Sequence, residues 1–320
     1  MGVTLFDGRP EALLQAMLLI RAYEERMMAL QAESGGTGTC TSVGQEAAAV
    51  GVVSALGADE LILTNHRSAG HLLARGADPG RLLAEVMGRR DGYCKGKSGS
   101  LHISAKALGV ILTSTIVGGE LALATGVALS QKLLRRPGVV VCFFGDGAAC
   151  QGRFHESLNL AAVWQLPILY VCENNQWQAF VHRRETMLSD NIAAHAAPYG
   201  IDSAAVDGND VEQVRAVALE ALDTVRAGGR PFLLEARTYR LRGHFEPDDQ
   251  AYVDPHELAE ARARDPLTRL QSRLLEAGHV DAAGVAAMAA EARRRIDAAY
   301  AFAIDSPYPA AAELVTDVYA

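Results

Sequence analysis

Asp146 and Asn175 are the residues whose types and spacing most directly suggest chemistry. Asp146 lies between two glycines directly after the apolar run 139–144, and Asn175 follows a second apolar run, 168–172. A helical pattern over about 150–164 connects the two runs. The segment is therefore predicted to form strand, loop, helix, strand and loop. In a parallel sheet, both loops would lie at the carboxyl edge of neighbouring strands, where open α/β sheets bind ligands.

A carboxylate and an amide oxygen at one sheet edge are suitable ligands for Mg²⁺, which keeps few protein ligands and completes its octahedron with phosphate oxygens. Gly145 and Gly147 would let the backbone approach a diphosphate, and the following helix would point its positive end at it. Each loop taken alone is an ordinary turn after a strand. Their combination, with Asp146 and Asn175 29 residues apart, favours a cation and diphosphate site.

The order Gly-Asp-Gly, about thirty residues, Asn-Asn resembles the thiamine diphosphate-binding motif. Four segments extend the likeness: 92–102, 145–152, 159–167 and 238–244. They resemble the α subunit of the decarboxylating component of 2-oxo acid and acetoin dehydrogenase complexes, and they are collinear with that family from about Leu18 to Leu274. The resemblance implies an α/β thiamine diphosphate-binding fold, with a parallel sheet covered by helices on both faces and helical extensions at both ends.

The resemblance assigns cofactor contacts to two groups of residues. The Mg²⁺ ligands would be the side chains of Asp146 and Asn175 and the backbone carbonyl of Trp177. Backbone N–H contacts to the diphosphate would come from Gly145, Gly147 and Ala148.

Three further residues occupy family positions around the cofactor. Arg67 stands in a His-Arg pair that the family places on the diphosphate, where a guanidinium forms paired hydrogen bonds; the alternative is a surface salt bridge, which is worth little. Val117 matches a segment whose backbone holds the aminopyrimidine ring, a role compatible with its place at the amino end of a helix. His244 matches a histidine on a mobile loop over the active-site channel. A histidine titrates near neutrality and can donate to a developing alkoxide or carboxylate; the alternative is an exposed loop histidine.

The chain departs from the family pattern at several positions. Ala69 stands where the family keeps an active-site histidine, and a methyl group cannot donate or shuttle a proton. The usual acid–base help for acyl transfer to a lipoyl group is therefore in doubt, unless His71 substitutes for it. Thr115 replaces a usual glycine. Phe245 replaces the regulatory serine of some relatives, so that phosphorylation switch is expected to be absent.

The segment 88–110 has many glycines and little periodicity. Irregular loops of this length in compact enzymes are usually functional. Lys95, Lys97 and His102 within it would border the active-site channel or face a partner chain; the alternative is a solvated basic loop.

The resemblance implies a partner subunit, because the chain has no place for the glutamate that activates the cofactor. Activation of thiamine diphosphate needs a buried glutamate against the aminopyrimidine ring, which single-chain relatives carry on a separate domain. At 320 residues, this chain has room for one such domain, expected over 1–254, followed by a helical extension over 255–320. The resemblance therefore implies a β subunit that supplies the glutamate in an α2β2 assembly. A lipoylated acyltransferase is a further candidate partner.

Composition excludes several classes of protein. The chain is 49% hydrophobic with a net charge of −8, which allows a large core and argues against a nucleic acid partner. Apolar runs of about six to nine residues are too short to span a bilayer. The first residues lack a signal or transit pattern. The cysteines show no disulfide or zinc spacing, so a reducing cytoplasm is expected, with Cys142 and Cys172 in the core.

The periodicity of apolar residues predicts the elements that position these residues. Helices are predicted over 11–32, 44–56, 79–87, 120–134, 150–164, 211–226, 255–278 and 281–302. Strands are predicted over 61–63, 139–144, 168–172 and 232–237. Irregular loops are predicted over 34–42, 88–110, 177–198 and 240–253. The Gly- and Ala-rich surfaces of 44–56 and 120–134 would allow close helix packing, either between subunits or inside one subunit.

These observations favour one function over two alternatives. The favoured function is an α subunit of a two-subunit thiamine diphosphate enzyme that decarboxylates or cleaves a small 2-oxo acid or acetoin and transfers the acyl unit. The first alternative is a carboligase of biosynthetic metabolism without a lipoyl partner, which Ala69 favours. The second is a non-catalytic scaffold paralogue, against which the intact Asp146, Asn175 and Arg67 argue.

Overall fold

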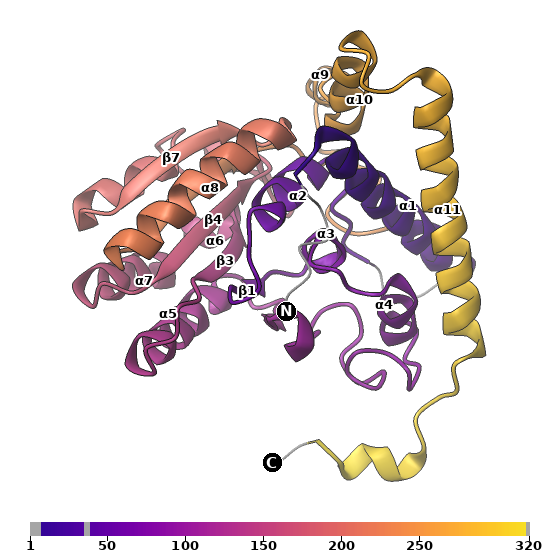
Figure 1. The fold of residues 1–320 in the computed structure, drawn as a ribbon, viewed down its shortest axis with the longest axis horizontal. Coiled ribbons are helices and arrows are strands. Elements are labelled where there is room, and N and C mark those ends of the chain that lie inside the picture. Colours follow the sequence, from indigo (N-terminus) through magenta and orange to yellow (C-terminus); the bar gives the residue numbers. More distant parts are fainter. Residues whose placement is uncertain (1–7, 35–38, 318–320) are drawn as a thin grey trace.

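The computed structural model describes residues 8–34 and 39–317 and has a six-stranded parallel sheet at its centre, with the strand order β2-β1-β3-β4-β8-β7 (Figure 1). The strands are β1 (Leu61–Thr64), β2 (Val110–Thr113), β3 (Val140–Gly145), β4 (Ile168–Asn174), β7 (Asp202–Asp207) and β8 (Phe232–Arg237). Because β3 and β4 are neighbours, with Gly145 opposite Glu173, the loops that carry Asp146 and Asn175 leave the sheet side by side. This arrangement confirms the predicted fold class.

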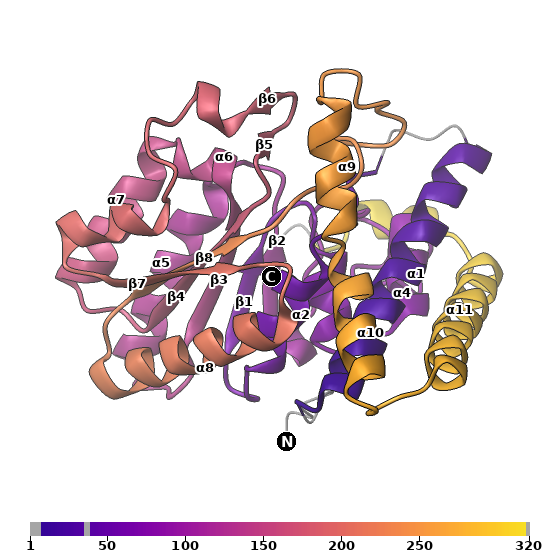
Figure 2. The same ribbon diagram turned by 90° about the horizontal axis from the view of Figure 1, so that it is seen from above.

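Helices cover both faces of the sheet (Figure 2). α2 and α8 lie on one face, with α1, α10 and α11 packed beyond α2, and α5 and α7 lie on the other face. The helices are α1 (Pro10–Ser34), α2 (Glu46–Ser54), α3 (Ala69–Ala74), α4 (Pro79–Val86), α5 (Gly119–Leu133), α6 (Asp146–Ala149), α7 (Gly152–Val163), α8 (Val211–Gly228), α9 (Pro255–Ala263), α10 (Pro266–Glu276) and α11 (Ala282–Asp305). Within the described ranges, no helix has the length and apolarity that crossing a membrane requires.

Alternating side chains of the strands form two hydrophobic cores. Val141 and Phe143 of β3 belong to the core under α2 and α8. Cys142 and Phe144 belong to the core under α5 and α7. Because successive side chains of a strand point to opposite faces, a strand covered by helices on both sides is apolar throughout. Cys142 and Cys172 are both fully buried, as predicted.

The prediction of one continuous helix over 255–278 is wrong. This segment forms two helices, α9 and α10, with a break before Pro266. Proline has no N–H group and clashes with the preceding helical turn, so it suits the first position of a new helix. The Asp265 side chain accepts hydrogen bonds from the N–H groups of Leu267 and Thr268 and caps that helix.

Several elements were not predicted. α3, β2 and β7 lie outside the predicted helices and strands. The segment 177–198 contains a short hairpin of β5 (Trp177–Gln178) and β6 (Val181–His182), followed by 3₁₀ turns at Arg183–Glu185 and Ala193–Tyr199. Further 3₁₀ turns lie at Lys106–Leu108 and Ala311–Val315. The predicted loop 34–42 falls partly on residues 35–38, and the predicted absence of a leader falls on residues 1–7, both outside the described residues.

Candidate active site

One cavity of about 300 Å³ lies at the carboxyl edge of the sheet, and all nine residues predicted for the site line it. Its wall includes the end of β3, the start of α6, the loop after β4, and loops after β1 and β8. The predicted residues in the wall are Arg67, Val117, Gly145, Asp146, Gly147, Ala148, Asn175, Trp177 and His244. Segments up to 177 positions apart in the chain therefore meet at the place that the parallel sheet predicts.

Asp146 is a buried carboxylate with a free coordination position. Its side chain is 1% exposed, and its Oδ2 atom has no hydrogen-bond partner among the described residues. Burial raises the pKa of Asp146 to about 6, against the opposing effect of backbone N–H groups and of the charges of Arg183 and Arg240. An unpartnered buried carboxylate oxygen is costly unless a cation binds it, so Asp146 fits a metal ligand.

Asn175 and Trp177 place further oxygen atoms beside Asp146. The Asn175 Nδ2 group donates to Gln45 Oε1 at 3.1 Å, and its Oδ1 accepts from the Trp177 N–H at 3.1 Å. An amide oxygen has two lone pairs, so Oδ1 retains one for a cation. The Trp177 indole donates to Tyr239 and Glu257, outside the cavity wall, so the main chain of Trp177 is the part available to a ligand in the cavity.

This donor set contains one carboxylate, one amide and one backbone carbonyl. Among the described residues, no group of three or more His, Cys, Asp or Glu side chains could hold a metal ion. Oxygen-only ligation with few charges suits Mg²⁺, which takes its remaining ligands from water and phosphate, and is unsuited to zinc. At Gly145, an added Cβ would meet no atom within 4 Å, so the backbone there is open to a close ligand.

Arg67 and His244 form one hydrogen-bonded unit. Arg67 Nη2 donates to the His244 carbonyl at 2.8 Å and lies 3.0 Å from His244 Nδ1, while Nη1 donates to the Thr41 carbonyl at 2.7 Å. Burial lowers the pKa of Arg67 to about 10, so the guanidinium keeps its charge at neutral pH. Within the described residues it forms no ion pair with a carboxylate. A buried, unpaired positive charge favours an anionic ligand.

His244 differs from the expectation that it titrates near neutrality. Burial and then the charges of Arg67 and Arg240 lower the pKa of His244 to about 4. A guanidinium can only donate, so Nδ1 of His244 is the acceptor and the proton of the neutral ring is on Nε2. His244 is therefore a neutral hydrogen-bond donor. Its position is fixed by its backbone N–H, which donates to Asp248 at 2.6 Å.

Val117 lies at the cavity rim and is 50% exposed. It precedes Gly118, which has φ of 77° and is the N-cap residue of α5. Val117 thus lies both in the cavity wall and at the amino end of the following helix. Thr115, where the family usually has glycine, has its Oγ1 3.4 Å from His102 Nε2.

Ala69 and His71 do not face the main cavity. Ala69 lines a small cavity of about 20 Å³ that adjoins the main one, because His66 lines both. His71 is 1% exposed; its Nδ1 lies 2.8 Å from Thr64 Oγ1 and its Nε2 lies 3.0 Å from Glu173 Oε1. Because both ring nitrogens are engaged, His71 is not placed to replace a histidine at position 69.

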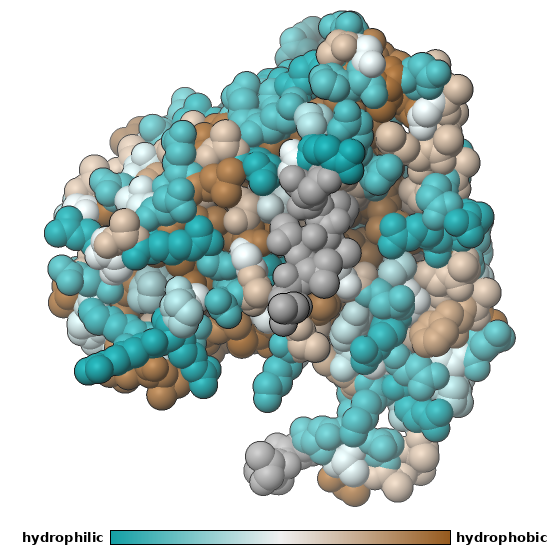
Figure 3. Space-filling view, viewed as in Figure 1, coloured by the Kyte–Doolittle hydropathy of each residue, from teal (hydrophilic) through white to brown (hydrophobic). Residues whose placement is uncertain are grey.

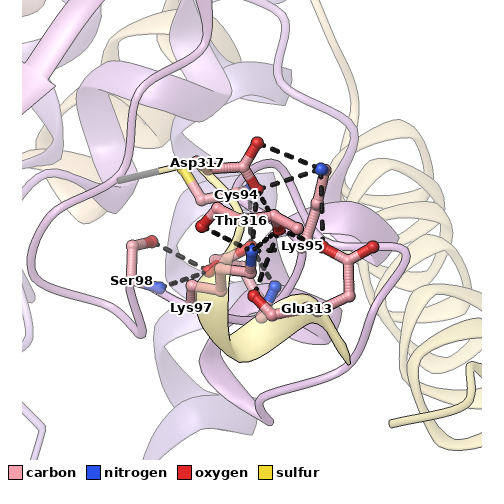
Figure 4. Close-up of polar contacts among 9 residues, drawn as sticks. Cys94, Lys95, Lys97, Ser98, Glu313, Thr316 and Asp317 are labelled. Atoms are coloured by element: carbon pink, nitrogen blue, oxygen red, sulfur yellow. Dashed lines mark hydrogen bonds and ion pairs between the residues drawn. The ribbon is translucent and has the colours of Figure 1, made fainter. Parts of the chain in front are cut away.

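Lys95 and Lys97 of the segment 88–110 bind the C-terminal part of the same chain, and neither lines the main cavity (Figure 4). Lys95 Nζ lies 2.9 Å from Asp317 Oδ2. Lys97 Nζ lies 2.7 Å from the same oxygen and 3.1 Å from Glu313 Oε2. The lysines therefore fasten the C-terminal segment to this loop.

The buried carboxylate of Glu85 gives this loop its shape. Glu85 accepts from the N–H groups of Cys94 at 2.6 Å, Gly96 at 2.9 Å and Ser98 at 2.8 Å, and from the Ser98 hydroxyl at 2.9 Å. A backbone segment that wraps around a carboxylate needs no helix or strand to satisfy its donors. The segment is therefore irregular but specifically organised.

Sequence reasoning did not single out several polar residues of the cavity wall, among them Gln45, Glu120, Glu173 and Arg240. Arg240 lies inside the family-like segment 238–244, which was its only signal. Glu120 is the one acidic residue in the first turn of α5, a place where acidic residues are common for reasons of helix polarity alone. No local sequence pattern marks Gln45 or Glu173 as a site residue. The fold brings both to the cavity wall.

α5, which begins two residues after Val117 at the cavity rim, and α7 expose apolar side chains. Leu123 is 50%, Leu133 72% and Val163 67% exposed. Apolar residues reach the surface at the lower left of Figure 3, where Figure 1 places α5. At Gly126 on this surface, an added Cβ would meet no atom within 4 Å. An apolar surface of this kind marks an interaction site.

Known proteins place this chain in a family. Residues 15–312 match the family described as dehydrogenase E1 component. The chain is 40% identical over 320 residues to the alpha subunit of acetoin:2,6-dichlorophenolindophenol oxidoreductase from Bacillus subtilis (strain 168), covering 99% of this chain and 96% of the relative. It is 36% identical to the pyruvate dehydrogenase E1 component subunit alpha of Rhizobium meliloti (strain 1021), covering 94% and 87%. The chain therefore belongs to the dehydrogenase E1 component family.

Proposed function

We propose that the chain is the α subunit of a thiamine diphosphate-dependent enzyme that decarboxylates or cleaves a small 2-oxo acid or acetoin and transfers the acyl unit. The observation that carries this proposal is the cavity whose wall contains all nine residues with a role in the family pattern. The names of the relatives refer to acetoin and pyruvate, which supports the same substrate class.

The proposed cofactors are thiamine diphosphate and Mg²⁺. When bound, thiamine diphosphate supplies the electron sink that cleavage of a carbon–carbon bond beside a carbonyl requires. Asp146, Asn175 and the Trp177 carbonyl would hold the metal. The diphosphate would lie against the backbone N–H groups of Gly145, Gly147 and Ala148, near the charge of Arg67. Val117 would support the aminopyrimidine ring through its main chain.

His244 would act on the substrate as a neutral hydrogen-bond donor. A pKa of about 4 means that the imidazolium form is scarce at neutral pH. Its Nε2–H group would stabilise an oxygen on which negative charge develops. The hydrogen bond from Arg67 to Nδ1, and the one from the His244 backbone N–H to Asp248, would hold the ring in place for this purpose.

The proposed partner is a β subunit that supplies the activating glutamate in an α2β2 assembly. The exposed apolar surface on α5 and α7, next to Val117 at the cavity rim, supports this partner. The enzyme would work in the cytoplasm on a small oxo substrate, with neither nucleic acid nor membrane as a partner. In this proposal, 1–254 is the cofactor-binding domain and 255–320 is a helical extension packed on it.

The test is Mg²⁺-dependent binding of thiamine diphosphate to the assembled enzyme, measured by calorimetry. Asp146→Ala should abolish it, because the diphosphate would lose its cation in a closed site. Asp202→Ala, at an exposed position of the edge strand β7, is the matched control and should bind normally. Unchanged affinity in Asp146→Ala would reject the metal role. Turnover of pyruvate or acetoin by the purified chain alone would reject the need for a β subunit.

Ala69 favours a second candidate function, a carboligase that passes the acyl carbanion to an acceptor other than a lipoyl group. The enzyme should then acylate a lipoyl domain poorly, since acid–base help is typically worth about 10²–10⁴ in rate. Ala69→His should raise lipoyl acylation more than it raises decarboxylation measured with an artificial electron acceptor. Efficient acylation by the unmodified enzyme would instead add a lipoylated acyltransferase to the partners and remove the reason for this alternative.

A further inference from the structure

The charged groups of the cavity wall fall into a basic and an acidic set. The basic set is Arg67 and Arg240, which both surround His244. Arg240 donates to the Ala179 carbonyl and the Tyr252 hydroxyl, each at 2.9 Å. Neither guanidinium forms an ion pair with a carboxylate in the described part of the chain. Their charge is therefore available to an anionic ligand.

Glu120 is an acidic residue of the cavity wall with an unsatisfied carboxyl oxygen. It lines the cavity from the first turn of α5 and is 2% exposed. Its Oε2 atom has no hydrogen-bond partner among the described residues, and no basic side chain there pairs with it. Burial raises the pKa of Glu120 to about 7. A buried carboxyl oxygen without a partner destabilises the fold, so its place in a ligand cavity indicates that a ligand completes its contacts.

The other acidic residues of the wall are Asp146, the proposed metal ligand, and Glu173, whose position neighbouring side chains fix. Its Oε1 lies 3.0 Å from His71 Nε2, and its Oε2 accepts from Asn65 Nδ2 at 3.4 Å. His71 is in turn held by Thr64 and packs against Phe143, with ring centroids 4.0 Å apart. Asn65 is held as well, because its Oδ1 accepts from the Arg67 N–H at 2.8 Å. Both partners of Glu173 are therefore anchored, and they fix the carboxylate in the cavity wall.

We propose that Glu120 and Glu173 form a cation-binding wall that recognises the positively charged ring of the cofactor. The inference rests on the proposed function and deepens it. Thiamine diphosphate is a dipolar ligand, with a diphosphate anion at one end and a cationic thiazolium ring beyond it. The cavity wall has two guanidinium groups without ion pairs and, besides the proposed metal ligand Asp146, the two carboxyl groups of Glu120 and Glu173, so it complements both charges. Glu120 makes the direct contact, and His71 is a positioning residue that acts through Glu173.

The experiment compares two ligands that differ in the charge of the ring. The assembled enzyme, freed of cofactor and supplied with Mg²⁺, is titrated with thiamine diphosphate and with thiamine thiazolone diphosphate, whose ring is neutral. The thiazolium nitrogen is fully substituted and carries no hydrogen, so its contact with Glu120 is an ion pair, which a buried site strengthens. Glu120→Gln should therefore weaken binding of the cationic cofactor by about tenfold or more. Its affinity for the neutral analogue should change by less than about twofold.

Glu24→Gln is the matched control. Burial raises the pKa of Glu24 to about 7 as well, but Glu24 accepts from the Ser42 N–H and hydroxyl and lies outside the main cavity. This variant should not change the ratio of the two affinities. His71→Gln should also weaken binding of thiamine diphosphate relative to the neutral analogue, but by less than Glu120→Gln does.

Two results would overturn the inference. An equal loss of both ligands in Glu120→Gln would show that the side chain only shapes the cavity. An unchanged affinity for both ligands would show that Glu120 does not contribute to binding them. Either result leaves the proposed function intact as long as Asp146→Ala abolishes Mg²⁺-dependent binding. Failure of the unmodified enzyme to bind either diphosphate would instead reject the proposed function.

Discussion

Two helices of similar composition, α2 and α5, have opposite surroundings. Every residue of α2 is buried, and at Gly51 an added Cβ would lie 2.5 Å from Val214 Cγ1 and 3.0 Å from the Val211 carbonyl oxygen of α8. On α5, Gly126 faces open space and Leu123 is 50% exposed. Small residues permit close approach of another helix in both cases. For α2 that helix is α8 of the same chain, whereas the described residues provide none for this surface of α5.

The difference shows where composition alone stops being informative. A Gly- and Ala-rich helix can pack tightly inside a subunit or between subunits, and the sequence left both readings open for these two segments. The layer order decides between them. α2 lies between the sheet and α1, while α5 lies at the edge of the molecule next to α7 (Figure 1). Variants of the two helices should therefore affect different properties.

Gly51→Leu should have the largest effect on stability. The new side chain would overlap Val214 and the backbone of α8, and a packed interior cannot make room for it. We expect a loss of roughly 3 kcal/mol or more in the free energy of unfolding, measured by chemical denaturation. If Gly51→Leu unfolded at the same denaturant concentration as the native chain, the contact between α2 and α8 would be looser than the structure shows.

Glu120→Gln should raise the free energy of unfolding, by a smaller amount that depends on pH. Burial raises the pKa of Glu120 from 4.5 to about 7, so the folded chain binds this proton more tightly than the unfolded chain. The carboxyl therefore lowers stability increasingly as pH rises from 4.5 to 7, and its full cost persists above pH 7. Removing it should raise the free energy of unfolding by about 2–3 kcal/mol at pH 8 and by close to zero at pH 4.5.

The measurement is denaturant unfolding at several pH values. Glu25→Gln, at an exposed position of α1, is the control and should leave the pH profile unchanged. An equal stabilisation at pH 4.5 and pH 8 would mean that the gain comes from packing and that Glu120 carries no unfavourable charge in the folded chain.

Gly126→Leu should have the smallest effect on the fold. Leucine has a higher helix propensity than glycine, so the stability of the chain alone should rise by less than about 1 kcal/mol. Its association with the β subunit should weaken by about tenfold or more, because the side chain would occupy the surface where a partner helix approaches. Sedimentation of the co-expressed chains measures this. Undiminished assembly would show that this surface of α5 is not the interface.

Local patterns predicted the central strands and the pair Asp146 and Asn175, whereas the resemblance to the family supplied the other seven cavity residues. The apolar runs of β3 and β4 are continuous, and the Gly-Asp-Gly and Asn-Asn turns follow them directly. β7 was missed because Asp202–Asp207 is a partly exposed edge strand with a polar residue at both ends, a pattern also found in loops. The division between α9 and α10 does have a local signal, because Asp265 and Pro266 are typical of a helix start.

Glu120 and Glu173 could not be assigned to the site from local patterns. Helix polarity alone accounts for Glu120. Glu173 departs from the apolar pattern of a buried strand, but nothing near it in the sequence shows what its carboxylate contacts. Their role depends on distant residues, since His71 and Asn65 reach Glu173 from more than a hundred positions away. Tertiary structure supplies this information, because it is the sheet order that brings the ends of β1, β3 and β4 together.

The carboxylate of Glu85 has a consequence for the order of folding. Its partners Cys94, Gly96 and Ser98 lie 9 to 13 residues along the chain, and loops of about ten residues close within tens of nanoseconds. We therefore expect the irregular segment to take shape together with α4, before the distant strands pair. The amides of Cys94, Gly96 and Ser98 should then exchange their hydrogens slowly with solvent, at rates ordinarily associated with helices and sheets, in a segment that contains almost no regular structure.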